Sequence, residues 1–434
     1  MRGFRTASKP VVVLAACAAL CAVGPAQAAG FAIFEQGAKP MGSAMAFTAQ
    51  ADDPSALFYN VGGLGFFEQR RFLAGATLIF LGDSAFQGAA PFPGPGATGE
   101  QVDQVQVPPH LYWVEPLGDG RRFKFGLSVT SPFGLSTEWE DPDTWSGRFI
   151  SEKAELRSID VTPCLGFRAG DKLALGIGAI ARFSDVELNN RQAAFNPFAG
   201  SFAEIAKAHL ESDVDTGYGF NVGLLHRPTD RFSWGLSYRS KIDVDYSGDA
   251  RLTQVFTGDP VFDAIVGGSL PFDEDLPIET SIEFPDQASL GFAYKLGGST
   301  VVELDVNRTG WSSFDTLDID FTQDPALSQS LVEDWDDAYN YRLGVAFSPN
   351  ERSQWRFGYY FDETPQPEES VSPLLPDADR NGVTVGYGWI GDRLTADFAV
   401  LYVMFKDRTT TTNRDGFNGT YDTDVWLLGA SLGW

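Results

Sequence analysis

The side chains best suited to metal binding or proton transfer are three histidines, and they are scattered along the chain. His110, His209 and His226 have no partner at metal-ligand spacing, so transition-metal binding is not expected. The stretch 377–382, which reads Asp-Ala-Asp-Arg-Asn-Gly, imitates the start of a calcium loop. Its twelfth position is Gly388, which has no carboxylate to bind the ion. We therefore predict neither a metal nor a cofactor.

Motifs for covalent catalysis and phosphate binding are also missing. Serine and acidic residues are plentiful, so composition alone leaves a Ser-His-acid arrangement open. However, no Gly-x-Ser-x-Gly elbow is present. Gly176-Ile177-Gly178 lies among alternating apolar residues rather than in a phosphate-binding loop. The sequence therefore favours a protein that is not an enzyme.

The elements that must position any site are indicated by a twofold hydrophobic rhythm. In the stretch 233–246 an apolar residue occurs at every second position, except that Ser240 interrupts the series. The residues between the apolar ones are small, polar or charged. Such a strand cannot bury its charges in a soluble core, but it can face lipid on one side and a wet lumen on the other. The pattern predicts a transmembrane β-barrel. The apolar residues expected on the lipid face are Trp234, Leu236, Tyr238, Ile242, Val244 and Tyr246.

Both ends of the chain fit a secreted barrel. Residues 1–28 combine three early cations, an apolar run over 11–23 and the small-residue site Ala26-Gln27-Ala28, and we predict that they are a signal peptide. The apolar run is too short for a transmembrane helix. The chain ends on Trp434 of an alternating strand, which resembles the signal by which barrel-assembly machinery recognises its clients. The expected location is the bacterial outer membrane. A net charge of −26 argues against a nucleic-acid partner.

The hairpins can be counted from their connections. Six short turns alternate strictly with seven longer polar or Pro/Gly-rich stretches, which predicts fourteen antiparallel strands over residues 67–434. The short turns are expected at 118–120, 169–171, 228–230, 297–298, 349–350 and 391–392. The long connections are expected at 83–101, 133–152, 191–210, 248–278, 322–335, 363–380 and 407–420.

Residues 29–66 precede the first predicted strand and do not have the pattern of one. They are rich in Gly, Ala and Ser, as tight packing against barrel walls requires, and they contain Asp52, Asp53 and Asn60 near the middle. The segment is too apolar for a solvated tail. We predict that it folds back into the lumen as a plug, or hatch. A disordered periplasmic extension is the alternative.

Two long loops carry apolar residues at three- and four-residue steps, which predicts two amphipathic helical stripes. An external loop in water has no structural need for such stripes. We interpret them as a landing groove for an apolar ligand, and the alternative is that each packs as a lid on the barrel mouth. The groove residues are Phe195, Phe198, Phe202 and Ile205 in the third loop, and Val261, Phe262, Ile265 and Val266 in the fourth.

Several collinear stretches resemble the FadL family of outer-membrane transporters of long-chain fatty acids and hydrocarbons. They span nearly the whole chain after the predicted signal peptide. The stretches are 131–135 (SPFGL) followed by 137–139 (TEW), 235–240 (GLSYRS), 309–314 (TGWSSF), 335–337 (WDD) with 341–344 (YRLG), 362–365 (DETP) and 375–380 (LPDADR).

The resemblance implies a fourteen-stranded barrel with an N-terminal hatch, and lateral passage of apolar ligand through the wall near a kinked third strand. Pro132 and Gly134 stand where that kink would form. A proline cannot donate to the ladder and a glycine tolerates an inward bulge, so the residue types fit. An ordinary strand end at a loop is the alternative.

Two departures from the family pattern bear on the substrate. The hatch reads Asn60-Val61-Gly62-Gly63 where the family typically has Asn-Pro-Ala. Asp336 occupies a position where the family often has a lysine that can face a ligand carboxylate. Arg191, at the end of the fifth strand, is a candidate for another basic contact, and Ser131 is a polar candidate beside the kink. Because a desolvated carboxylate needs a cation, losing one makes a neutral hydrocarbon or aromatic a serious alternative substrate.

These expectations together describe passive transport. Hydrophobic small molecules, either fatty acids or hydrocarbons, are expected to bind in the loops and to diffuse laterally through the barrel wall into outer-membrane lipid. An outer-membrane lipid hydrolase with a Ser-His pair on the lipid-facing wall is the runner-up. A general polar porin is a third, weaker reading, because the hatch should block bulk flow.

Overall fold

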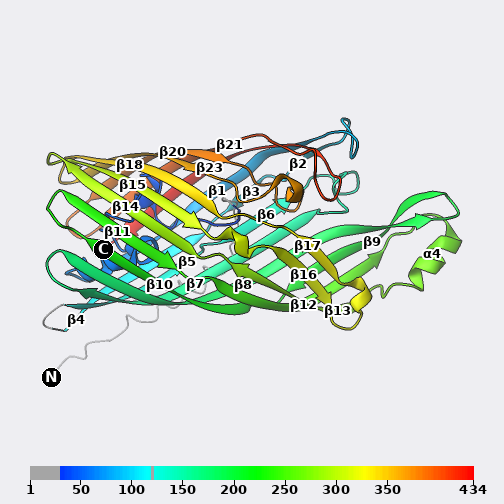
Figure 1. Ribbon diagram of the computed structural model, residues 1–434, viewed down its shortest axis with the longest axis horizontal. Helices are drawn as coiled ribbons and strands as arrows, with labels where there is room; N and C mark the ends of the chain where they lie inside the picture. The colour runs from blue at the N-terminus through cyan, green and yellow to red at the C-terminus, as the bar shows by residue number, and fades with distance from the viewer. Residues whose placement is uncertain (1–29, 119–121) are drawn as a thin grey trace, which may run out of the picture.

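The computed structural model describes residues 30–118 and 122–434 (Figure 1). The predicted signal peptide lies outside this part of the chain, as does most of the turn predicted at 118–120. Among the described residues, no helix is long and apolar enough to span a membrane.

The strands form one closed antiparallel barrel of fourteen strands, as the hairpin count predicted. Closure comes from the pairing of the first strand with the last, from Leu73 opposite Gly433 to Gly88 opposite Gly419. Closing the sheet removes exposed edges, which a barrel in lipid requires. Four of the five short turns that the structure describes in full fall between neighbouring strands, as predicted. The fifth, predicted at 349–350, lies at 351–352, because the strand before it continues to Asn350. All five are at one end of the barrel (Figure 1).

Several wall positions hold two or three consecutive strands, because the chain is interrupted without leaving the wall. In order, the fourteen positions are β1 (Arg71–Gly88); β2 (Thr98–Glu100), β3 (Gln104–Gln106) and β4 (Pro109–Leu117); β5 (Phe123–Thr130) and β6 (Gly134–Glu138); β7 (Lys153–Arg168); β8 (Leu173–Asn196); β9 (Ser201–Ser212) and β10 (Asp215–His226); β11 (Phe232–Arg239) and β12 (Ile242–Gln254); β13 (Asp275–Phe284) and β14 (Gln287–Leu296); β15 (Thr300–Thr309) and β16 (Thr316–Phe321); β17 (Gln329–Val332) and β18 (Ala338–Asn350); β19 (Ser353–Asp362); β20 (Arg380–Ile390); β21 (Thr395–Phe405) and β22 (Arg408–Thr409); and β23 (Gly419–Gly433).

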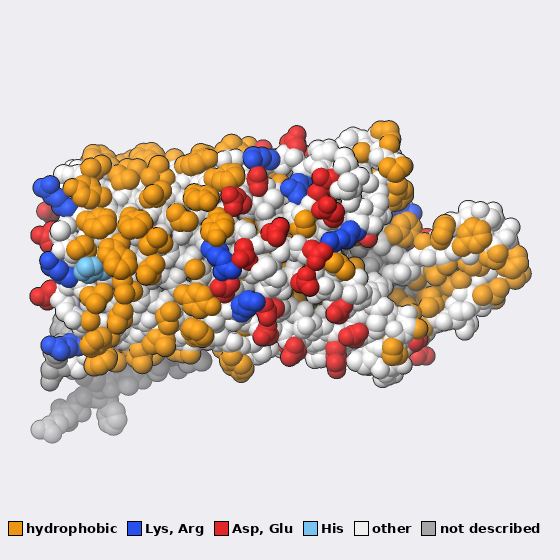
Figure 2. Space-filling model, viewed as in Figure 1, with side chains coloured by type: hydrophobic (Ala, Val, Ile, Leu, Met, Phe, Trp, Pro, Cys, Tyr) orange, Lys and Arg blue, Asp and Glu red, His pale blue; other side chains and the backbone are white. Residues whose placement is uncertain are grey.

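The outer surface has a broad apolar belt near the short turns and a band of charged side chains beyond it (Figure 2). In β23, Trp426 and Trp434 are 51% and 55% exposed, whereas the intervening Leu427 and Ser431 are buried in the lumen. The alternation therefore sorts side chains between lipid and lumen, as expected for an outer-membrane strand.

The single lipid face predicted over 233–246 is wrong beyond Ser240. Leu236 faces outward, but Ile242, Val244 and Tyr246 are buried inside the barrel. The cause is the interruption between β11 and β12, where the Ser240 hydroxyl accepts a hydrogen bond from the Phe220 N–H at 2.9 Å. A break of this kind moves every later side chain to the opposite face.

The third-loop prediction of a helical stripe is also wrong. Residues 191–210 form the two arms of the β8–β9 hairpin, in which Phe195 pairs directly with Phe202. The fourth loop does contain a helix, α4 (Pro260–Gly267), whose N-cap is Asp259. The long connections also contain two short helical turns, η3 (Pro325–Leu327) and η4 (Glu368–Ser370), and a third, η2 (Trp311–Ser313), lies in the interruption between β15 and β16.

Residues 30–66, called here the N-terminal segment, lie within the barrel (Figure 1). They contain α2 (Ala38–Met41), α3 (Ala56–Tyr59) and η1 (Val61–Phe66). The segment crosses the lumen, since α2 contacts β20, β21 and β23 while η1 contacts β7, β8 and β10. Small residues permit this approach: a Cβ on Gly42 would meet the Gly386 Cα at 2.9 Å.

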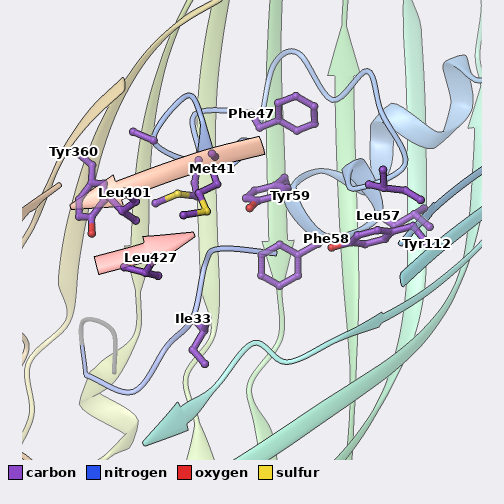
Figure 3. Close-up of a cluster of buried hydrophobic side chains, with 14 of the residues drawn as sticks. Ile33, Met41, Phe47, Leu57, Phe58, Tyr59, Tyr112, Tyr360, Leu401 and Leu427 are labelled. Carbon is purple, nitrogen blue, oxygen red and sulfur yellow. The ribbon is translucent and has the colours of Figure 1, made fainter. Parts of the chain in front are cut away.

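An apolar cluster fixes the N-terminal segment to the wall. Figure 3 shows Met41, Phe47 and Tyr59 of the segment beside Tyr360 and Leu401 of the barrel. All five side chains are at least nine-tenths buried. Burying a large apolar side chain contributes about 1.5–3 kcal/mol, so this cluster is a main source of the segment's attachment.

Candidate functional site

A cavity of about 490 Å³ lies toward the long-loop end of the barrel. This volume is within the range of small-molecule pockets. Its apolar side is built from inward-facing residues of neighbouring strands, which meet because side chains alternate along each strand. Six of these lining residues are Leu188, Ile205, Leu210, Leu252, Ile319 and Phe321.

The other side of the cavity is polar, and both of its cations are already paired. The Lys153 ammonium lies 2.9 Å from a carboxylate oxygen of Glu155 and 2.6 Å from one of Glu187. Arg414 forms an ion pair with Asp334. Among the described lining residues, no unpaired cation therefore faces the cavity.

Glu333 also lines the cavity, and it is buried. One carboxylate oxygen accepts a hydrogen bond from the Trp335 indole N–H at 3.0 Å. Burial raises the pKa of Glu333 to about 7, because desolvation disfavours the charged form. The charge of the cavity wall consequently changes near neutral pH.

The eight predicted groove residues separate into three sets. Phe195, Phe198 and Phe202 are exposed on the β8–β9 hairpin, and Val261 and Ile265 are exposed on α4. Phe262 and Val266 are buried and pack with Ile205 against the inner side of the same loops. Ile205 is the member of the eight that lines the cavity.

An aromatic cluster packs around Phe31, near the start of the described chain. The Phe31 ring centroid lies 4.6 Å from that of Trp311, 5.3 Å from Phe314 and 5.9 Å from Trp335. The ring centroids of Phe133 and Phe284 each lie 6.0 Å from that of Phe31. Leu188 and Leu331, which line the cavity, pack against this cluster. The apolar cluster that contains Phe31 therefore extends to the cavity.

The third wall position is interrupted at residues 131–133, between β5 and β6. At this strand break the backbone forms hydrogen bonds with the N-terminal segment. The Ile33 N–H donates to the Pro132 carbonyl at 2.7 Å, and the Gly134 N–H donates to the Phe31 carbonyl at 2.9 Å. The Ser131 hydroxyl donates to the Ser158 carbonyl at 2.7 Å. Backbone hydrogen bonds therefore join the strand break directly to the N-terminal segment.

Arg191 is occupied by three carboxylates. Its guanidinium lies 2.6 Å from Glu152, 2.6 Å from Glu204 and 2.8 Å from Asp143. It is buried and is not among the residues lining the cavity. As the structure stands, its charge is neutralised by protein groups.

The three polar residues predicted in the hatch stabilise its turns. Asp52 forms an ion pair with Lys39 at 2.8 Å, and Asp53 accepts a hydrogen bond from the Ser55 N–H at 2.9 Å. Asn60 is fully buried, where its amide donates to the Thr48 carbonyl at 2.7 Å.

Two acids on β15 form an anchor that sequence reasoning missed. Asp305 accepts from the N–H groups of residues 47 and 48, both at 2.9 Å. Glu303 accepts from the N–H groups of residues 49 and 50, at 2.6 and 3.3 Å. The sequence signal was two acids at alternate positions on the lumen face of an apolar strand, where only a bonding partner compensates burial.

One of the three histidines touches a serine. His110 Nε2 lies 2.8 Å from the Ser431 hydroxyl, which also accepts the Ala38 N–H at 3.0 Å. The pair faces the lumen, and the second ring nitrogen of His110 has no partner. A hydrolase on the lipid-facing wall would need the pair on the opposite face and a third group to orient the histidine.

Solved structures reproduce this fold. A FadL homologue of Pseudomonas aeruginosa is similar with a TM-score of 0.81 and 22% identity, covering 94% of this chain and 99% of that one. The Pseudomonas putida toluene transporter TodX has a TM-score of 0.65 and 17% identity, with coverage of 88% and 93%. These likenesses show the barrel architecture.

Sequence comparison gives the family. A long-chain fatty acid transport protein of Escherichia coli O6:H1 is 23% identical over 431 residues, which cover 94% of each chain. The family described as "Outer membrane protein transport protein (OMPP1/FadL/TodX)" matches residues 19–433. The resemblance, the outer-membrane location and the transport class predicted from sequence are therefore confirmed. This chain belongs to the OMPP1/FadL/TodX family of outer-membrane transport proteins.

Proposed function

We propose that this protein takes up hydrophobic molecules from the cell exterior and releases them sideways into the outer membrane. Fatty acids and hydrocarbons are the proposed substrates, in keeping with the names of the relatives. The observation that carries the proposal is spatial. A cavity of about 490 Å³ with one apolar side adjoins the apolar cluster that contains Phe31, and that cluster adjoins the strand break at 131–133.

The proposed route has three steps. Exposed apolar side chains on the β8–β9 hairpin and α4 collect the ligand first. The ligand then enters the cavity, where burial contributes about 25 cal/mol per Å² of apolar surface. Finally Phe31 withdraws, and the ligand occupies the space it leaves beside Pro132. No chemical step is needed, because each transfer moves apolar surface from one apolar environment to the next.

The N-terminal segment acts as the hatch in this proposal. Its hydrogen bonds to Pro132 and Gly134 close the strand break from inside. Moving residues 31–34 would open the side wall without opening a pore to the periplasm, because residues 38–66 stay anchored on β15 and in the apolar cluster of Figure 3. This arrangement disfavours a polar porin. The inward-facing His110–Ser431 pair likewise disfavours the hydrolase.

Uptake of labelled palmitate and of an alkylbenzene by cells lacking the gene, with and without a plasmid copy, tests the proposal. We expect uptake of at least one compound to depend on the protein. Ile319→Asn, in the cavity wall, should lower uptake strongly. Val214→Asn is the matched control, since Val214 is exposed between β9 and β10 and does not line the cavity. Uptake that is independent of the protein would overturn the proposal.

A further inference from the structure

The barrel wall is also interrupted between the position of β13 and β14 and the position of β15 and β16 (Figure 1). β13 pairs with β16 as far as Thr280, and pairing resumes at Gln287 of β14, which lies opposite β15. Residues 281–286 and 310–318 lie between these two ladders and do not continue the strand pairing. We call these two facing stretches the seam.

The inner side of the seam is covered by aromatic rings. Phe284 comes from one edge of the seam, Trp311 and Phe314 come from the other, and all three side chains are buried. Their ring centroids lie 6.0, 4.6 and 5.3 Å from that of Phe31. The apolar cluster that contains Phe31 therefore reaches the seam as well as the strand break at 131–133.

The two edges of the seam are joined by hydrogen bonds and an ion pair. The Gly310 N–H donates to the Asp286 carbonyl at 2.9 Å, and the Ser313 hydroxyl donates to the Glu283 carbonyl at 3.0 Å. The Arg308 guanidinium, which is partly exposed, lies 3.2 Å from the Asp286 carboxylate. Ion pairs near the surface add little stability, so the seam should open more easily than a continuous ladder.

An apolar groove of about 640 Å³ lies on the outer wall beside the seam. Arg308 lines the groove and is two residues from Gly310 of the seam. Apolar side chains on the outer wall of such a barrel face lipid, so the groove adjoins the acyl chains of the membrane. The apolar members of its lining include Leu236, Tyr238, Ala288, Leu290 and Val306.

We propose that the seam is a second side opening, through which hydrophobic substrate passes between the Phe31 cluster and the outer groove. When residues 310–315 move outward, Trp311 and Phe314 leave the lumen, and the apolar cluster becomes continuous with the groove. The ligand then moves from aromatic rings to acyl chains without meeting bulk water, so its apolar surface stays covered. The inference rests on the proposed function and adds an exit that is separate from the strand break at 131–133.

A disulfide that locks the seam tests the proposal in cells lacking the gene, with the full chain supplied on a plasmid. A Cβ on Gly310 would lie 3.2 Å from the Asp286 Cγ, so the variant Gly310→Cys/Asp286→Cys places two thiols within reach of each other. Phe292→Cys/Leu304→Cys is the matched control, because these exposed register partners lie where β14 and β15 pair continuously. Initial uptake of labelled palmitate is measured after oxidation and again after reduction with dithiothreitol.

Oxidation of the seam pair should lower palmitate uptake at least about twofold, because one of two parallel exits is then closed, and reduction should restore it. Oxidation of the control pair should leave uptake unchanged. Equal uptake by the oxidised and reduced forms of the seam variant would overturn the second opening. Wild-type uptake no greater than that of cells without the protein would instead overturn the proposed function.

A variant without cysteines tests the same opening if the seam pair fails to assemble in the membrane. Asp337 pairs with Arg308 and accepts a hydrogen bond from the Ser312 hydroxyl at 2.8 Å. Asp337→Asn weakens this outer closure and should raise the uptake rate about two- to fivefold, the effect of one partly exposed ion pair. Asp320→Asn is its control, since Asp320 is exposed on β16 outside the seam. Unchanged or slower uptake by Asp337→Asn would overturn the proposal.

Discussion

The acid pair on β15 should decide whether the lumen stays closed. In the double variant Glu303→Ala/Asp305→Ala, the backbone N–H groups of residues 47–50 lose their acceptors. Each buried donor left unsatisfied costs about 1–3 kcal/mol, so the four together cost roughly 4–12 kcal/mol. At the lower figure, opening of residues 47–50 becomes about 1000-fold more frequent. The barrel itself should persist, since its strand pairing is unchanged.

Two measurements follow this opening. Amide hydrogen exchange of residues 47–50 should accelerate about 1000-fold or more relative to wild type, for the free-energy cost just given. Single-channel recordings in planar bilayers should show a conductance that wild type lacks. Asp318→Ala/Asp320→Ala is the matched control, because those acids have the same spacing but are exposed on β16. If both double variants exchange and conduct alike, the acid pair does not anchor the segment.

Three further predictions concern the proposed route. Phe31→Ala leaves an apolar void in the aromatic cluster and should destabilise the closed N-terminal segment by about 3–5 kcal/mol. Alkylbenzene binding measured by calorimetry should therefore become tighter, and weaker binding would contradict this prediction. Methyl palmitate should bind about three- to tenfold more tightly at pH 6 than at pH 8, because Glu333 is largely neutral below its pKa of about 7 and charged above it. Hydrogen bonds from Trp335 and Gln366 and the charge of Arg414 lower the pKa of Glu333, whereas burial and the charge of Asp415 raise it. Glu333→Gln should abolish the pH dependence of methyl palmitate binding. Pro132→Val restores a backbone donor at the strand break and should slow uptake in cells while leaving the Kd of the purified protein unchanged; unchanged uptake would argue against lateral exit there.

The barrel was predictable because its signals are local and repeated. Alternation along each strand and a turn or loop after each one are read from neighbouring residues, and thirteen connections require fourteen strands. The failure at Ser240 has the opposite character. One interruption between β11 and β12 moves Ile242 and Val244 from the lipid face to the lumen face. The alternation of apolar and polar residues in the sequence continues through this interruption, so it does not reveal the change of face.

The third loop shows how a hairpin imitates a helix. Phe195 and Phe202 are seven residues apart, which is two turns of a helix, but they are also cross-strand partners on either side of a tight connection. Spacing alone does not distinguish the two arrangements. In the fourth loop the helix is present, and the structure shows it capped by Asp259 and starting at Pro260.

The polar sites in the lumen were beyond sequence reasoning for a related reason. Arg191 and Arg342 are both arginines of the inner wall, and nothing in their neighbouring residues separates them. The first meets three carboxylates from distant parts of the chain, whereas the second meets none among the described residues. That difference depends on which neighbouring strands and loops bring carboxylates to each arginine.

Phe31 belongs to the apolar cluster that extends from the cavity to the strand break. A ligand that occupies this space excludes the phenyl ring, so ligand binding and closure compete for one volume. If closure is favoured by about 3 kcal/mol, the apparent affinity falls by roughly 100-fold relative to the open protein. We therefore expect a bound ligand to displace the Phe31 ring and to accelerate hydrogen exchange of residues 31–34. If saturating alkylbenzene leaves the exchange of residues 31–34 unchanged, ligand binding and closure do not compete for this space.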